Sequence, residues 1–447
     1  MTQKELARKA MNRASKRLIP FLFLMYILAF LDRANVGFAK EYLAADAGIS
    51  AAAFALGAGI FFIGYAIFEV PSNLIMHKVG ARRWLSRIMI TWGMVAACFA
   101  FVPNDTVFLI LRVLLGIAEA GFFPGVIYFL CFWFTKERRT SVIALFFAAV
   151  PAALVVGGPL SGFLLEKTHD FLGIAGWKWM FLIEGFMPVV VGVIALFYLT
   201  DRPSEAKWIP EDERRALQNE LEAELREGGM VQHGGILKAL THPMVLFLIV
   251  LNFMLNISLY GVTFHLPTHV GHLLGSAVNF KVGLISAIPW FVGVAVVIYT
   301  GRMADKNGLN AAIGAVVIAM SGVGLIISQS MDPVWGIFGL CLAASGALAG
   351  FPMFWAMPPR FLNGAALAGA VGLINCLGNL GGFVAPNLRE YITKVSGGQN
   401  DALVAIGLVG ILAALLFLVT IKMGIGHRKL TQKPEVPGAE KARYEAA

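Results

Sequence analysis

The chain has 447 residues, of which 58% are hydrophobic and 14% are charged, and its mean hydropathy is +0.74. Soluble domains devote about a quarter of their residues to charge, so this composition excludes an ordinary soluble protein and indicates an integral membrane protein. The formal net charge of +9 comes from basic loops, so it gives no reason to invoke nucleic-acid binding.

Apolar runs that are long enough to cross a bilayer recur along the whole chain. They begin near residues 18, 54, 84, 107, 141, 177, 244, 282, 311, 334, 362 and 403, which predicts twelve transmembrane helices. Hydropathy falls between Thr200 and His242, where prolines and mixed charge predict a solvated linker. We expect two six-helix bundles (1–199 and 243–422), a cytoplasmic linker (200–242) and a cytoplasmic tail (423–447).

Lysine and arginine are concentrated in alternate connections. They precede the first span and follow the second and fourth spans, and the tail is also rich in them. The connection at 103–106 carries none of these basic residues. By the positive-inside rule both termini lie in the cytoplasm, which predicts a multi-pass protein of a bacterial inner membrane.

The first and fourth spans carry charges that lipid would not tolerate. Asp32 and Arg33 lie in the first span, and Arg112 and Glu119 lie in the fourth. Each costs at least ~3 kcal/mol near the bilayer centre, even on a lenient scale. Arg112 and Glu119 are seven residues apart and share a helix face, and helices entering from opposite sides bring Asp32 and Arg112 to similar depth. We expect one shared cavity, which is either a pair of structural salt bridges or an anion site with a titratable switch.

Motifs of enzymes are missing from the sequence. It contains no GxxxxGK[ST], HExxH or GxSxG pattern, so we expect no catalytic activity. His265, His269 and His272 share roughly one face of the seventh span, but polar contacts at the membrane surface are favoured over a metal site. An anion channel or a non-transporting membrane receptor remains an alternative. A channel, however, does not need titratable acids at mid-depth.

Two pairs of segments suggest that the halves repeat one another. NLIMHKVGARR (73–83) follows the second span and GRMADKNG (301–308) follows the eighth, while GGPLSG (157–162) in the fifth span is similar to GNLGGFVAP (378–386) in the eleventh. With these repeats, Asp32-Arg33, Arg112 followed by Glu119, and AGFFPG, the chain resembles the major facilitator superfamily over essentially its whole length. Within it, the chain resembles the anion:cation symporter family. The linker DRPSEAKW resembles bacterial members that carry sugar acids, tartrate or aromatic carboxylates.

The resemblance implies proton-coupled uptake of a small organic carboxylate by a monomer in the lipid bilayer, with the proton gradient as driving force and no cofactor. Sodium coupling remains an alternative. It implies that Asp32 and Glu119 couple protons and that Arg33 and Arg112 bind the substrate carboxylate. Further implied substrate-binding residues are Tyr65, Asn252, Trp355 and Asn375, and the implied gating residues are Lys78, Arg82, Asp305 and Lys306. The first-half loop departs from the family pattern, with Asn73 and His77 where glycine and aspartate are usual.

The substrate class is open between two kinds of carboxylate. Tyr65, Asn252 and Asn375 offer partners for hydroxyl groups, which favours a sugar acid such as an aldonate or tartrate. Phe30, Phe354 and Trp355 favour an aromatic acid stacked on rings, such as a hydroxyphenylacetate- or phthalate-like compound. We prefer the sugar acid.

Overall fold

The computed structural model describes residues 2–227, 242–330, 332–358, 364–396 and 399–425. Within these ranges the chain is helical, and twelve helical segments are long and apolar enough to span a membrane. The predicted twelve-helix membrane protein is confirmed. Large apolar side chains such as Ile67, Phe197 and Val316 are more than 60% exposed, which suits helices that face lipid.

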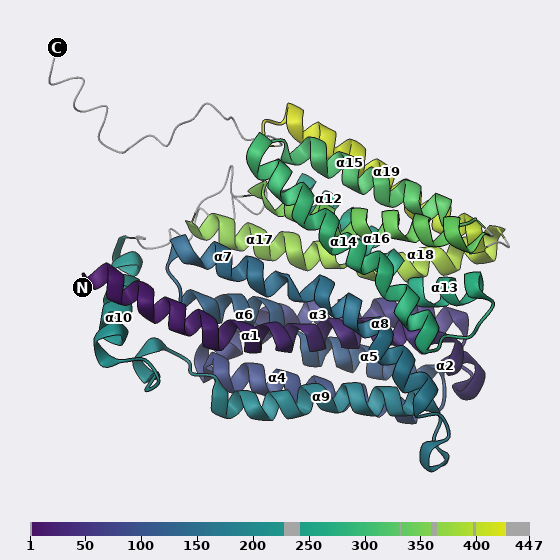
Figure 1. Cartoon of the computed structure of the whole chain (residues 1–447), viewed down its shortest axis with the longest axis horizontal. Coiled ribbons are helices and arrows are strands. Elements are labelled where there is room, and N and C mark those ends of the chain that lie inside the picture. The colour runs from purple at the N-terminus through teal and green to yellow at the C-terminus, as the bar shows by residue number, and fades with distance from the viewer. Residues whose placement is uncertain (1, 228–241, 331, 359–363, 397–398, 426–447) are drawn as a thin grey trace.

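Helices of the two halves form two layers that lie one above the other in Figure 1. The N-terminal half holds α1 (Gln3–Phe38), α2 (Lys40–Ala47), α3 (Ala51–Val79), α4 (Ala81–Cys98), α5 (Asp105–Glu119), α6 (Phe122–Cys131), α7 (Lys136–Phe147), α8 (Ala149–Lys167) and α9 (Gly176–Tyr198). The linker contains α10 (Glu211–Glu227). The C-terminal half holds α12 (Pro243–Thr263), α13 (Leu266–Leu274), α14 (Phe280–Asn307), α15 (Asn310–Ile327), α16 (Pro333–Trp355), α17 (Gly364–Asn379), α18 (Gly381–Ser396) and α19 (Gln399–Lys422).

Two ends of the molecule can be told apart by their short helices. At the linker end α10 packs against the start of α1, where Arg13 Nε and Glu213 Oε2 form an ion pair at 2.8 Å. Because α1 has 36 residues and rises about 1.5 Å per residue, it is much longer than one membrane span and its first turns extend to the linker. The opposite end carries α2 and α13 (Figure 1).

The fourth span is interrupted near its middle, although its sequence predicted one continuous helix. α5 ends at Glu119 and α6 begins at Phe122, with Gly121 between them at φ +83°. A side chain at Gly121 would also place its Cβ 2.3 Å from Ser72 Oγ, so glycine is required there by conformation and by space. Ser72 Oγ donates to the Ala120 carbonyl at 2.7 Å, which satisfies one backbone acceptor released by the break. The break ends α5 directly after its buried acid.

The two halves touch along α8 with α14 and along α3 with α18. At the first contact the backbones of Gly158 and Gly283 approach so closely that a Cβ on Gly158 would lie 2.4 Å from the Gly283 carbonyl oxygen. Small residues allow this approach in membranes. Towards the opposite end, Tyr42 Oη donates to the Val278 carbonyl at 2.7 Å across the same interface. In this structure the two halves are therefore in contact at the opposite end.

We predict that Gly158→Val prevents this contact and favours an arrangement in which the halves separate at the opposite end. A cysteine at Val278, placed in a chain whose native cysteines are replaced, should react faster with a membrane-impermeant maleimide, by about tenfold for a shift of ~1.4 kcal/mol. Gly372→Val is the matched control, because a Cβ at Gly372 meets nothing within 4 Å. Equal labelling rates in both variants would contradict the role of the glycine contact.

Candidate functional site

An ion pair between α1 and α5 lies inside the protein. Arg33 Nη2 donates to Glu119 Oε1, and the two residues are 8% and 0% exposed. The Glu119 carboxylate stands on the last residue of α5, so the helix break sets its position. Burying both charges is costly, and the pair persists only because each partner neutralises the other.

Aromatic rings surround the Arg33 guanidinium. Its Cζ atom lies 5.1 Å from the centroid of Phe30, 5.4 Å from that of Phe61 and 5.2 Å from that of Tyr65. Each such contact is worth about 0.5–2 kcal/mol, more when water is excluded. The rings hold a cation in place without supplying a negative charge, so Glu119 remains the carboxylate that neutralises Arg33 directly.

Arg112 is bound by backbone rather than by a carboxylate. Its Nε donates to the Gly57 carbonyl at 2.8 Å and its Nη2 donates to the Ala58 carbonyl at 3.3 Å, both on α3. Arg112 is 2% exposed and interacts electrostatically with Asp32 and Glu119. The two acids and two arginines thus interact electrostatically with one another, but only Arg33 and Glu119 form a direct salt bridge among the described residues.

A second group of polar side chains continues from Asp32 within the N-terminal half. The Asn35 side chain lies near both Asp32 and Glu184, and its Nδ2 atom is buried without a hydrogen-bond partner among the described residues. Glu184 Oε1 accepts a hydrogen bond from Ser161 Oγ at 2.8 Å. Asp32 Oδ2 and Glu184 Oε2 are buried and have no hydrogen-bond partner among the described residues. Asp32 therefore occupies a different environment from Glu119, which has an arginine in contact.

The C-terminal residues predicted for the site lie at three different places. Asn252 Nδ2 donates to the Ile374 carbonyl at 3.0 Å, which engages this buried amide within its own half. Trp355 is the last residue of α16 and packs edge-on against Phe354 at 5.0 Å. Asn375 on α17 lies near Glu69 on α3, which belongs to the other half.

The predicted gating residues lie at the ends of α3, α4 and α14. The Arg82 backbone N–H donates to Asp201 Oδ1 at 2.7 Å, and Arg82 Nε lies 3.9 Å from Asp201 Oδ2, so this pair joins the start of α4 to the start of the linker. Lys78 is exposed near the end of α3. Asp305 and Lys306 lie on α14, but their side chains fall outside the part of the chain that the structure describes.

The three histidines near the opposite end have separate partners. Arg389 contacts His265 at 2.8 Å, His269 Nε2 contacts the Ser328 carbonyl at 2.8 Å, and His272 Nε2 lies 3.6 Å from Glu41. Among the described residues no group of three histidine, cysteine or acidic side chains is arranged to hold a metal ion.

Tyr260 on α12 was not predicted for the site. Its side chain lies near Arg33 and interacts with it electrostatically, and its ring packs against Phe62 of α3 with centroids 4.6 Å apart. The residue is 3% exposed and comes from the opposite half to Arg33. A hydroxyl inside an apolar span needs a polar partner, which is the signal in the sequence that could have indicated Tyr260.

Comparisons with known proteins identify the family of the chain. The family model of the Major Facilitator Superfamily matches residues 22–386, and the chain belongs to this superfamily. The chain is 43% identical to an Agrobacterium vitis protein named "Putative tartrate transporter", over 93% of this chain and 95% of that protein. It is 40% identical to the Escherichia coli inner membrane transport protein RhmT, over 90% and 92% of the two chains. A crystal structure of a bacterial homologue of the lysosomal transporter Spinster has a TM-score of 0.71 at 14% identity, covering 93% and 98%.

We predict that Arg112→Lys destabilises the protein by about 1–3 kcal/mol and reduces transport strongly. A lysine ammonium keeps the charge but cannot reproduce the fixed fork that reaches both α3 carbonyls, and a buried charged donor that loses hydrogen bonds costs this much. Thermal unfolding in detergent and uptake into proteoliposomes measure the two effects. Arg87→Lys is a suitable control, because that guanidinium lies over the Trp84 ring on a half-buried surface of α4. Wild-type stability and uptake in Arg112→Lys would contradict the prediction.

Proposed function

We propose that this member of the superfamily is a proton-coupled symporter that takes up a small organic carboxylate. The observation that supports it best is the buried Arg33–Glu119 ion pair. In this state Glu119 occupies the arginine that a substrate carboxylate would need. Substrate and ionised Glu119 therefore compete for one guanidinium.

Charge balance gives the coupling its sign. Asp32, Arg33, Arg112 and Glu119 sum to zero when all four are ionised, and they interact with one another inside the protein. A bound carboxylate adds one negative charge to a group that is shielded from water, where an uncompensated charge costs several kcal/mol. A proton on Glu119 removes that charge and releases Arg33 at the same time. Substrate and proton then bind together more favourably than either alone.

Movement of the two halves would carry the bound pair across the membrane. The site lies mainly in the N-terminal half, while Tyr260 and Asn375 approach it from the C-terminal half. Separation of the halves at one end and contact at the other would expose the site to each side in turn. We infer that the linker end faces the cytoplasm of a bacterial inner membrane, because the basic connections lie there.

The preferred substrate class is a sugar acid or tartrate, supported by the name of the A. vitis relative at 43% identity. One structural feature favours the aromatic alternative. Tyr26 on α1 packs with Phe30, Phe123 and Phe146 at centroid distances of 5.2, 5.8 and 4.4 Å, which builds an aromatic group beside Arg33. An aromatic acid could place its carboxylate at Arg33 and its ring on this group.

Amide variants of the two acids test the coupling. Glu119→Gln should abolish accumulation driven by a pH gradient, by ~100-fold or more relative to wild type, because the amide cannot carry the proton but still releases Arg33. It should retain exchange of labelled against unlabelled substrate. Asp32→Asn should also lose accumulation. Asp170→Asn, at an exposed position, is the control. Wild-type accumulation in both Glu119→Gln and Asp32→Asn would show that neither acid couples transport.

A competition panel tests the substrate class. Uptake of radiolabelled tartrate by vesicles should be inhibited by excess aldonate and tartrate, and should be insensitive to neutral sugars, because only carboxylates can replace Glu119 at Arg33. Stronger inhibition by hydroxyphenylacetate than by aldonates would select the aromatic class instead. Inhibition by neutral sugars, with no effect of any carboxylate, would contradict an anion site.

A further inference from the structure

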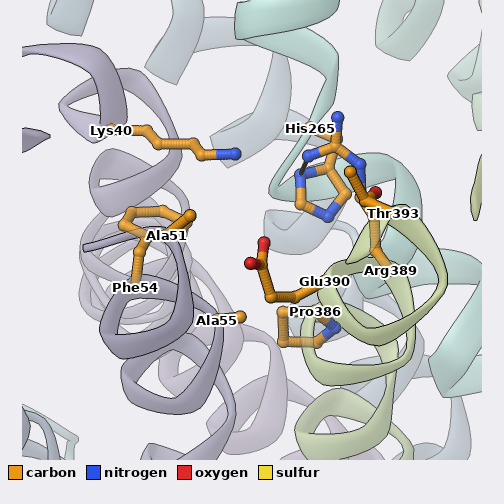
Figure 2. A pocket seen from close by; sticks show the side chains of 9 residues that line it. All are labelled: Lys40, Ala51, Phe54, Ala55, His265, Pro386, Arg389, Glu390 and Thr393. Atoms are coloured by element: carbon orange, nitrogen blue, oxygen red, sulfur yellow. Dashed lines mark hydrogen bonds between the residues drawn. The ribbon is translucent and has the colours of Figure 1, made fainter. Parts of the chain in front are cut away.

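A pocket separate from the central ion pair lies between the two halves at the opposite end (Figure 2). It has a cavity volume of about 150 Å³. Lys40 and Phe54 form its wall on the N-terminal half, and His265, Pro386, Arg389 and Glu390 form its wall on the C-terminal half. We call the space that these six residues line the inter-half pocket.

The charges of the inter-half pocket are mainly positive. The Lys40 side chain extends across the gap towards His265, and the Glu390 carboxylate points into the space between the walls (Figure 2). Glu390 also lies 3.6 Å from Lys394, one turn further along α18, which offsets its charge. Arg389 is 8% exposed and lies on α18 beside Glu390. Lys40 and Arg389 are therefore two cations on opposite walls of the pocket, with the Glu390 carboxylate between the walls.

His265 adds a hydrogen-bond donor without a partner. A guanidinium can only donate, so the 2.8 Å contact from Arg389 Nη1 makes His265 Nδ1 the acceptor. The proton of the neutral ring then resides on Nε2. This atom is buried in a residue that is 4% exposed, and it has no hydrogen-bond partner among the described residues. A buried donor that is left unsatisfied costs about 1–3 kcal/mol, which an acceptor in the pocket would recover.

From this geometry we propose that the inter-half pocket is a second binding site, which takes a small carboxylate of the transported class between Lys40 and Arg389. An Arg fork and a Lys point charge both suit a carboxylate. The apolar walls formed by Phe54 and Pro386 offer contact to a carbon skeleton, which a bare inorganic anion lacks. The choice of ligand rests on the proposed function, but the existence of the site does not.

Occupation of the pocket would favour one conformation of the transporter. Lys40 belongs to the N-terminal half, whereas Arg389 and His265 belong to the C-terminal half, so the site exists only while the halves are together at this end. A ligand shifts a conformational equilibrium only by its difference in affinity for the two states. A carboxylate bound here stabilises the state closed at the opposite end, and relieves repulsion between the two cations.

The charge state of Lys40 makes binding dependent on pH. Burial lowers the pKa of Lys40 to about 8, and the Arg389 charge acts in the same direction, while Glu390 and Glu41 oppose it. The other titratable groups near this position are His265 and His269 on the C-terminal half and His272, which lies beside Glu41. Lys40 is therefore charged below about pH 8 and neutral above it. Carboxylate affinity should fall about tenfold between pH 7 and pH 9, and Lys40→Arg should remove most of this dependence.

Calorimetric titration of the purified full chain with sodium tartrate tests the site. We expect Arg33→Gln, which disables the central site, to retain one tartrate-binding event, and Arg33→Gln with Lys40→Gln to lose it. Arg33→Gln with Lys281→Gln is the matched control and should retain it, because Lys281 is exposed on α14 and does not line the pocket. Glu390→Gln should tighten residual binding several-fold, since it removes a competing carboxylate. Lys40→Gln in the otherwise wild-type chain should also remove one of two binding events. This variant keeps the test valid even if the Arg33 variants misfold.

Three results would overturn the proposal. The first is that the wild-type chain binds tartrate but Arg33→Gln binds none. The second is that Arg33→Gln binds tartrate and that adding Lys40→Gln leaves this binding unchanged. The third is residual binding of sodium sulfate alone, which would exclude a carboxylate site. Failure of the proposed function looks different, because wild-type vesicles would then transport no carboxylate whatever the titrations show.

Discussion

The buried contact between Arg33 and Glu119 is the constraint on which the rest of the structure depends. Two charges that lie away from water are tolerable only while they neutralise one another, and loss of either partner costs about 3–5 kcal/mol. Any anion that binds Arg33 must therefore displace Glu119, and the displaced acid must take a proton or find another cation. Arg112 is already bound to the carbonyls of α3, so it gives Glu119 little alternative. We propose that coupling between anion and proton follows from this shortage of partners for the Glu119 carboxylate.

Several features of the fold serve that contact. The break at Gly121 ends α5 at Glu119, and the Ser72 hydroxyl satisfies the carbonyl that the break releases. Rings of α1 and α3 enclose the guanidinium from the same half. Tyr260 brings a hydroxyl from the other half, so relative movement of the halves alters the surroundings of Arg33. The Gly158–Gly283 contact lets the halves approach closely enough for this to occur.

Hydropathy and buried charge predicted most of this arrangement. The twelve spans follow from the lengths of the apolar runs. The grouping of the four charged residues (Asp32, Arg33, Arg112 and Glu119) follows from their helical spacing and their depth in the bilayer, because lipid excludes charge from most other positions. Partner choice could not be predicted, since Arg112 finds backbone carbonyls whose position depends on how α3 and α5 pack. The same limit applies in the C-terminal half. The resemblance implies a substrate-binding role for Asn252. Its amide donates to the Ile374 carbonyl in the structure, while Tyr260, two turns later, lies near Arg33. The break at Gly121 also depends on a tertiary partner, Ser72.

Proton uptake that accompanies substrate binding tests the central claim most directly. Purified protein in weakly buffered detergent solution near neutral pH would receive saturating tartrate or hydroxyphenylacetate while the pH is recorded. The competition between substrate and Glu119 for Arg33 predicts that binding withdraws protons from solution in wild type, and that Glu119→Gln binds the same ligand with a markedly smaller uptake. Binding that withdraws no protons in wild type, or an uptake that is unchanged in Glu119→Gln, would contradict the account.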